Sequence, residues 1–175
     1  MRKQPRAPKL LDEGALWAYA LKALGARALS VSELRQRLQR RAQPSVEIGS
    51  VLAKLREYGY LDDQQFAGTY ASARLNNQGL GKMRVLRDLR QRRVAPGIAQ
   101  QAVEQTFAEV DEVALIEQYL QRKFRTVKLS EHLVEPKNLA AAYRRLRYAG
   151  FSPGNCIRVL KRFAAQADEL ESFEE

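Results

Sequence analysis

Hydrophobic residues recur along this chain every three or four positions, which is the spacing of one face of an α-helix. Leu16, Ala20 and Leu24 form the first stripe, and four comparable stripes follow between residues 48 and 164. No stretch alternates apolar and polar residues with β-branched enrichment, so no sheet is expected. The pattern predicts nine helices, over residues 12–24, 30–41, 45–58, 62–77, 81–92, 96–107, 111–125, 136–149 and 153–167.

Signals for helix ends fall at the borders of these stripes. Ser30 and Glu33 have the spacing of a capping box, and Ser152 with Pro153 is typical of a helix start. The stretch EYGYLDDQQFA, residues 57–67, contains two adjacent aspartates. They could be paired catalytic carboxylates, but adjacent side chains at a helix start point in different directions. We therefore interpret Asp62 as a helix cap. The glycines expected to end helices are Gly25, Gly59, Gly79 and Gly150.

The same plan recurs three times. Each copy has an apolar helix, a pair of residues that contains arginine, a proline or serine turn, and a second helix. Leu38, Leu89 and Leu146 occupy equivalent positions. Units of this size bury too little apolar surface to be stable alone, so neighbouring units should pack end to end. We expect an all-α fold of three tandem three-helix repeats that form an elongated, curved array. The expected divisions are a basic tail 1–11, repeats 12–61, 62–110 and 111–167, and an acidic tail 168–175.

Positive charge dominates the composition. The chain has 30 Lys and Arg against 20 Asp and Glu, a net charge of +10. Charged helix faces usually serve solubility, but arginine at matching places in each repeat favours contacts with phosphates or carboxylates. The predicted partner-binding or DNA-binding residues are Arg35, Arg37, Arg40, Arg41, Lys82, Arg84, Arg87, Arg90, Arg92, Arg93, Arg144, Arg145 and Arg147.

Motifs for catalysis and for cofactor binding are missing from the sequence. It contains no P-loop, GxGxxG, paired CxxC, HExxH or GxSxG pattern, and it has one histidine, His132, and one cysteine, Cys156. We expect no enzymatic activity, no cofactor, no metal and no small-molecule substrate. No apolar run reaches the length of a membrane span, and the single cysteine favours a reducing cytoplasm.

The sequence resembles the RecX family, bacterial modulators of the RecA recombinase. The resemblance is carried by residues 59–63, GYLDD, then Phe66-Ala67, Arg74, the glycines Gly79 and Gly81, and the arginine-rich helix over residues 83–93. The chain has RRV at residues 92–94 where the family usually has Lys-Gly-Ile, and Asp88 where a glutamate is frequent. The resemblance implies a cytoplasmic regulator that lodges in the groove of the RecA–DNA filament. It also implies inhibition of ATP hydrolysis, strand exchange and co-protease activity, with effects on recombination, DNA repair and the SOS response.

The first repeat alone supports a different function. Its helices around the Pro44 turn resemble the helical half of a winged-helix transcription regulator, in which the second helix would read the major groove. A β-hairpin wing should then follow Leu61, whereas the sequence there has a helical pattern. Direct DNA regulation is therefore the alternative, and weak binding to single-stranded or double-stranded DNA is expected in either case because of the charge.

Overall fold

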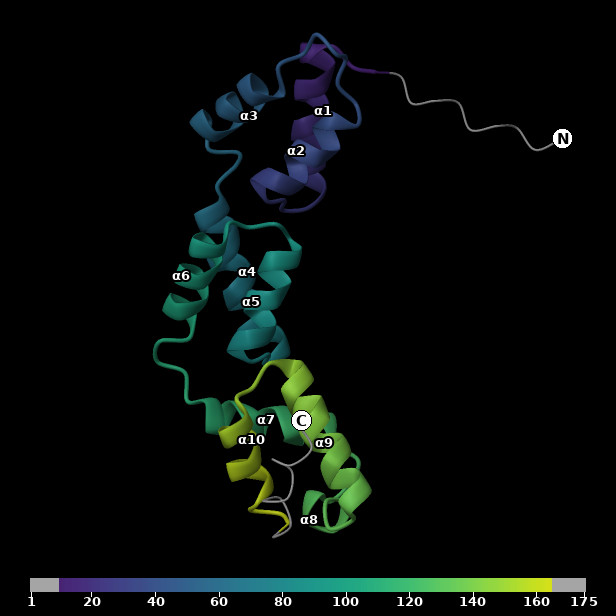
Figure 1. Cartoon of the computed structure of the whole chain (residues 1–175), viewed down its shortest axis with the longest axis vertical. Helices are drawn as coiled ribbons and strands as arrows, with labels where there is room; N and C mark the ends of the chain where they lie inside the picture. Colours follow the sequence, from purple (N-terminus) through teal and green to yellow (C-terminus); the bar gives the residue numbers. More distant parts are fainter. Residues whose placement is uncertain (1–9, 165–175) are drawn as a thin grey trace, which may run out of the picture.

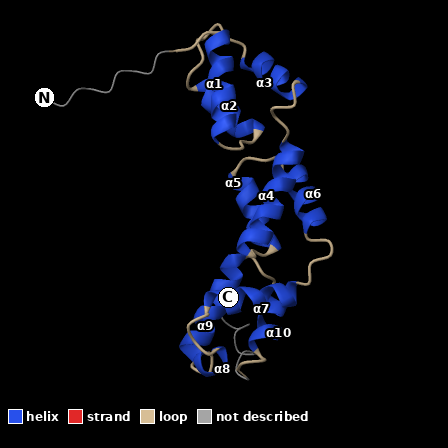
Figure 2. Ribbon diagram, turned by 180° about the vertical axis from the view of Figure 1, so that it is seen from behind, coloured by secondary structure: helices blue, strands red, loops and turns tan. Residues whose placement is uncertain are grey.

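The computed structural model of the protein describes residues 10–164. This part of the chain is an elongated stack of helices, in which three groups follow one another along the long axis (Figure 1). Within residues 10–164 there is no β-strand, only one isolated bridge between Leu11 and Ala42 (Figure 2). The predicted all-α fold of tandem three-helix repeats is confirmed. No helix in this part of the chain is long and apolar enough to cross a membrane.

The first unit contains α1 (Glu13–Ala26), α2 (Val31–Gln39) and α3 (Ile48–Glu57). Its core includes Leu16, Leu34 and Leu38, all of them fully buried. The capping box is confirmed: the Ser30 hydroxyl accepts from the Glu33 backbone N–H, and the Glu33 carboxylate accepts from the Ser30 N–H.

The second unit contains α4 (Asp63–Gln78), α5 (Lys82–Gln91) and α6 (Pro96–Thr106). Leu89 lies at the centre of a separate core. Asp62 is the cap of α4, and its carboxylate accepts from the backbone N–H groups of Gln64 and Gln65. The cap interpretation is therefore confirmed, and α4 occupies the place where a winged helix would have its hairpin.

The third unit contains α7 (Glu112–Lys123), α8 (Leu129–His132), α9 (Pro136–Ala149) and α10 (Pro153–Leu160). A third core surrounds Leu146 and Phe151, and Cys156 is one of its small buried members. Leu38, Leu89 and Leu146 are thus each fully buried in their own unit, as expected of equivalent positions.

Some predicted helix limits were wrong. Helix α3 begins at Ile48 rather than at residue 45, because residues 43–46 form a turn closed by the Val46 N–H and the Gln43 carbonyl. Gly25 lies inside α1, and α10 ends at Leu160. The short helix α8 occupies a stretch that the pattern left irregular. The predicted acidic tail, and all but residues 10 and 11 of the predicted basic tail, lie outside the described residues.

Candidate partner-binding surface

The cations predicted to bind a partner divide into two groups. One group contacts other parts of the same chain: Arg84, Arg87 and Arg92 reach a neighbouring unit, whereas Arg41, Arg145 and Arg147 contact groups of their own unit. The other group lies on the helices or in the turns that follow them. Arg37 and Lys82 are half-buried, and the remaining members are exposed: Arg35, Arg40, Arg90, Arg93 and Arg144.

Arg92 connects the first unit to the second. Its guanidinium donates to both carboxylate oxygens of Glu33, at 2.7 and 3.0 Å, and to the carbonyl of Ala28 at 2.8 Å. The same residue lies over the rings of Phe66 and Tyr70 in its own unit, 5.0 and 5.6 Å from their centroids. A bidentate guanidinium–carboxylate pair fixes both distance and orientation, so Arg92 sets how these two units meet.

Two further hydrogen bonds complete this junction. The buried Ser30 hydroxyl donates to the Arg92 carbonyl at 2.6 Å, and the Val31 N–H donates to the Asp63 carboxylate at 2.8 Å. Asp63 is the second aspartate of the LDD sequence, and the two aspartates have different structural roles. Asp62 caps its own helix, and Asp63 satisfies a free N–H at the start of α2.

Burial raises the pKa of the Glu33 carboxyl, but hydrogen bonds from Arg92 and from the Ser30 backbone outweigh it, so its pKa lies below the ordinary 4.5. A group with a depressed folded-state pKa stabilises the fold above its unfolded pKa and loses that contribution as pH falls through the folded pKa.

We expect the urea concentration at the midpoint of unfolding to fall as pH decreases from about 6 to about 3. Glu33→Gln should flatten this dependence. Glu13→Gln, at the exposed pair with Lys54, should retain the wild-type slope; equal slopes in the two variants would contradict the assignment.

The second and third units meet through Tyr148. The guanidinium of Arg84 lies 4.6 Å from the Tyr148 ring centroid, and Arg87 donates to the Tyr148 carbonyl at 3.1 Å. Arg84 is itself held by the buried carboxylate of Asp88 at 2.9 Å. Burial lowers the pKa of Arg84, but the hydrogen bonds and charge attraction from Asp88 and Tyr148 together outweigh it, so the pKa is raised. These arginines therefore help to order the chain itself. Arg84 is largely covered, whereas Arg87 remains exposed.

Backbone atoms also touch at this second junction. The Gly81 N–H donates to the Ala149 carbonyl at 2.9 Å, and the Met83 N–H donates to the Gly150 carbonyl at 3.1 Å. A Cβ on Gly81 would lie 2.4 Å from the Gly150 oxygen, so only glycine permits this approach. Leu80 packs against the cores of both units. The second junction is thus close-packed, whereas a polar cluster around Arg92 marks the first.

Exposed cations remain on all three units. Arg35 and Arg40 are exposed in the first unit, Arg90 and Arg93 in the second, and Arg144 in the third. Arg87 and Arg145 are exposed as well, although they also contact groups of the chain itself. We define Arg35, Arg90 and Arg144, one exposed cation per unit, as the arginine set.

Sequence patterns missed several residues that organise this surface. No sequence pattern singles out Tyr148, yet its ring is contacted by two arginines of another unit, Arg84 and Arg87. Arg74 donates to the Tyr70 hydroxyl at 2.6 Å and lies 3.7 Å from the Asp88 carboxylate. Arg122 of α7 donates to the Gln78 carbonyl at the end of α4. Only the Arg74–Tyr70 pair, four residues apart on α4, has a local sequence signal; the other pairings join residues far apart in the chain. No His, Cys, Asp or Glu cluster in residues 10–164 is arranged to hold a metal.

The fold and these residues define a class: an elongated helical-repeat protein with exposed cations on each of its three units. Comparison with known proteins agrees. Residues 62–103 match the family model described as RecX, second three-helix domain. The regulatory protein RecX of Deinococcus radiodurans is 37% identical over 110 residues, which cover 62% of this chain and 50% of that protein. The chain thus matches about half the length of this relative. RecX of Syntrophotalea carbinolica is 32% identical over 108 residues, covering 62% of this chain and 71% of that protein.

The chain belongs to the RecX family of regulatory proteins. Solved structures agree at the level of the fold. The crystal structure of RecX from Lactobacillus salivarius has a TM-score of 0.62 and 16% identity, covering 91% of this chain and 96% of that one. A second RecX crystal structure has a TM-score of 0.60 and 18% identity, covering 83% and 72%.

Proposed function

We propose that this protein binds along the groove of the RecA–DNA filament and inhibits RecA ATPase, strand exchange and co-protease activity. The observation that carries the proposal is the stack of three units with an exposed arginine on the equivalent helix of each, α2, α5 and α9. A filament repeats its own subunits along an axis, so an elongated array can contact several of them at once. The proposed setting is the cytoplasm, with no cofactor, metal or small-molecule substrate, and the protein acts by binding rather than by catalysis.

Several weak contacts suit this mode of binding. Once one unit is bound, the next binds at a high effective concentration because the units are held at fixed spacing. The two junctions supply that spacing, since Arg92 and the Gly81–Gly150 contact fix how the units meet. The arginines then need to supply only modest attraction each. The same charge gives weak binding to free DNA, single-stranded or double-stranded.

The arginine set is the sharpest test of the binding surface. Replacing Arg35, Arg90 and Arg144 together by alanine should weaken binding to RecA filaments by about tenfold or more, because one contact is lost in every unit. The measurement is co-sedimentation of the protein with filaments at fixed salt. Replacing Arg84, Arg87 or Arg92 instead would also disturb the junctions between units. A loss of filament contacts could then not be distinguished from a change in the arrangement of the units.

The matched control removes the same charge from other exposed positions. Arg56, Arg125 and Lys137 are exposed and lie outside the predicted contacts. Their combined replacement by alanine should weaken binding far less than loss of the arginine set. Equal losses would show that net charge alone attracts the protein to the filament.

A further inference from the structure

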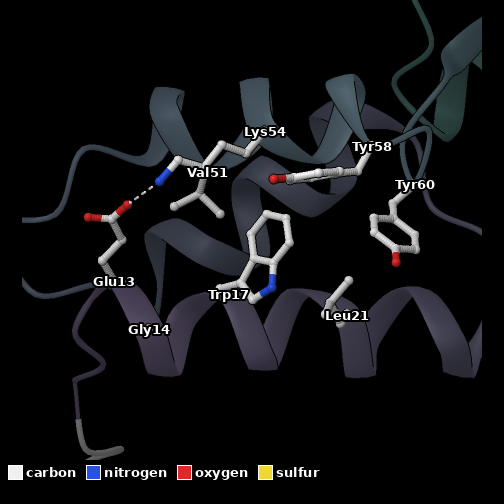
Figure 3. Close-up of a pocket in the computed structure, with 8 residues that line it drawn as sticks. All are labelled: Glu13, Gly14, Trp17, Leu21, Val51, Lys54, Tyr58 and Tyr60. Carbon is white, nitrogen blue, oxygen red and sulfur yellow. Dashed lines mark hydrogen bonds and ion pairs between the residues drawn. The ribbon is translucent and has the colours of Figure 1, made fainter.

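A groove lined by aromatic rings lies between α1 and α3, and none of the cations predicted to bind a partner lines it (Figure 3). Its volume is about 650 Å³, which lies within the range of ligand sites. The indole of Trp17 meets the Tyr58 ring edge-on, with centroids 5.9 Å apart. Tyr58 and Tyr60 are 65% and 56% exposed, so much of their ring surface can contact a ligand. We call this space the aromatic groove.

A second hollow continues the aromatic groove onto the next unit. Tyr60 lines both spaces, and the second one is also lined by Leu24, Phe66 and Tyr70, with a volume of about 470 Å³. Figure 3 shows Glu13 at one end of the aromatic groove and Tyr60 at the other, beside the chain that leads to α4. Two apolar hollows in a row suit an extended segment with apolar groups at short intervals.

The charges along these two hollows favour a cationic ligand. Glu13 lines the aromatic groove, and Asp62 lines the second hollow. Lys54 is the one cation among the lining residues of the two, and it already donates to one oxygen of Glu13 at 3.0 Å. The Glu13 side chain is 57% exposed, and the two capping bonds of Asp62 end on one oxygen of an exposed residue. Both carboxylates can therefore accept from a further cation.

The sequence that precedes the first described residue has the complementary chemistry. Residues 1–9 read MRKQPRAPK, with four Lys and Arg and no acid. Proline fixes φ at about −65° and restricts the residue before it, so Pro5 and Pro8 together favour a polyproline II helix. Such a helix has about three residues per turn, which would place both prolines on one face. Three cations recur at the same interval and would share a neighbouring face: Lys3, Arg6 and Lys9.

This segment is long enough to pass over both hollows. It joins the described chain at Leu10, three positions before Glu13 at the end of the aromatic groove. Nine residues of polyproline II helix span about 28 Å, at about 3.1 Å per residue. The stretch of α1 from Glu13 to Leu24, which lies beside both hollows, is about 17 Å long at about 1.5 Å per residue. A reversal of the chain next to Leu10 would therefore bring the segment along α1 as far as the second hollow.

We propose that residues 1–9 dock on the aromatic groove of their own chain as a polyproline II segment, with prolines against the rings and cations beside Glu13 and Asp62. Grooves lined by aromatic rings are common receptors of such segments, because the preformed helix loses little entropy on binding. Attachment at Leu10 gives the segment an effective concentration of roughly 1 mM, far above that of a second copy. The aromatic groove is thus a site for a proline-rich, cationic ligand, and the chain itself supplies that ligand.

A peptide with the sequence of residues 1–10 tests the site in the full-length protein. The receptor carries Pro5→Ala and Pro8→Ala, which disable its own segment, and circular dichroism checks its fold. Trp17 is the only tryptophan in the chain and lines the groove, so its fluorescence reports binding. The peptide should bind this variant saturably and the unmodified protein about tenfold more weakly, because the attached segment competes at a high effective concentration. A peptide of the same composition, with its prolines adjacent, is the control and should bind neither protein.

Replacing the acid of the groove distinguishes a cationic ligand from an anionic one. In the same receptor, Glu13→Gln should weaken peptide binding by about threefold, since an exposed ion pair is lost and Lys54 is left unpaired. An anionic ligand would bind this variant more tightly. Glu131→Gln is the matched control, because Glu131 pairs with Lys128 at 3.0 Å in the third unit and is also exposed. That replacement should leave the peptide affinity unchanged.

Acrylamide quenching of Trp17 tests the contact in the intact chain. The unmodified protein should be quenched less than the variant with Pro5→Ala and Pro8→Ala, and to the same extent at every protein concentration. Protection that grows with protein concentration would show docking on a second copy and would overturn the proposal. Equal peptide affinity for the two proteins, no binding to either, or equal binding of the control peptide would overturn it as well. No RecA is present in these titrations, so their failure would leave filament inhibition intact.

Discussion

Replacing Gly150 by alanine is expected to lower the free energy of unfolding by about 3 kcal/mol or more and to loosen the third unit from the second. Two costs combine. Gly150 has a φ of +93°, which is strained for any residue with a side chain. A Cβ there would also lie 2.2 Å from the Arg84 backbone nitrogen, and a backbone atom cannot move aside cheaply.

Urea denaturation followed by circular dichroism measures this effect. Gly154→Ala is the matched control, because Gly154 lies in α10 and a Cβ added there would meet no atom within 4 Å. That replacement should be neutral or stabilise the protein by up to about 1 kcal/mol, because alanine favours the helix. If Gly150→Ala were as well tolerated as Gly154→Ala, the close contact between these units would be refuted.

Replacing Arg92 by alanine is expected to cost about 2 kcal/mol and to uncouple the first unit from the rest. The change removes hydrogen bonds to the partly buried Glu33 carboxylate and to the Ala28 carbonyl. It also uncovers the rings of Phe66 and Tyr70. The first unit should then unfold earlier than the other two. The Trp17 fluorescence, which reports the first unit, should therefore change at a lower urea concentration than the circular dichroism of the whole chain.

Arg90→Ala is the control for Arg92→Ala. It removes the same charge from the last turn of α5, and the Arg90 side chain is exposed. Its unfolding curve should match that of the unmodified protein. A single transition in Arg92→Ala, at an unchanged midpoint, would mean that Arg92 does not hold the units together.

Local sequence signals predicted most of the fold. The equivalence of Leu38, Leu89 and Leu146 could be predicted because each lies on the apolar stripe of a helix. In the structure each of the three is fully buried. Ser30 and Asp62 were recognisable as caps because a cap acts within three residues of itself. Helix limits were less certain where a turn resembles a helix start, as at residues 43–46.

The candidate surface was harder to predict, for a physical reason. An arginine side chain can bind a phosphate on a partner or a carboxylate of its own chain, and the sequence alone does not show which of these two contacts it makes. Arg92 pairs with Glu33, which is 59 positions away in the chain. Likewise, Arg84 and Arg87 meet Tyr148 only after the third unit has docked. Which arginines remain available to a partner was therefore decided by tertiary contacts.

The most direct test of the central claim is the single-stranded-DNA-dependent ATPase of RecA from the same source, titrated with this protein at physiological salt. The account predicts inhibition at well below one protein per RecA subunit, while RecA stays on the DNA. Full ATPase activity at a molar excess of the protein, with unchanged filaments, would contradict it.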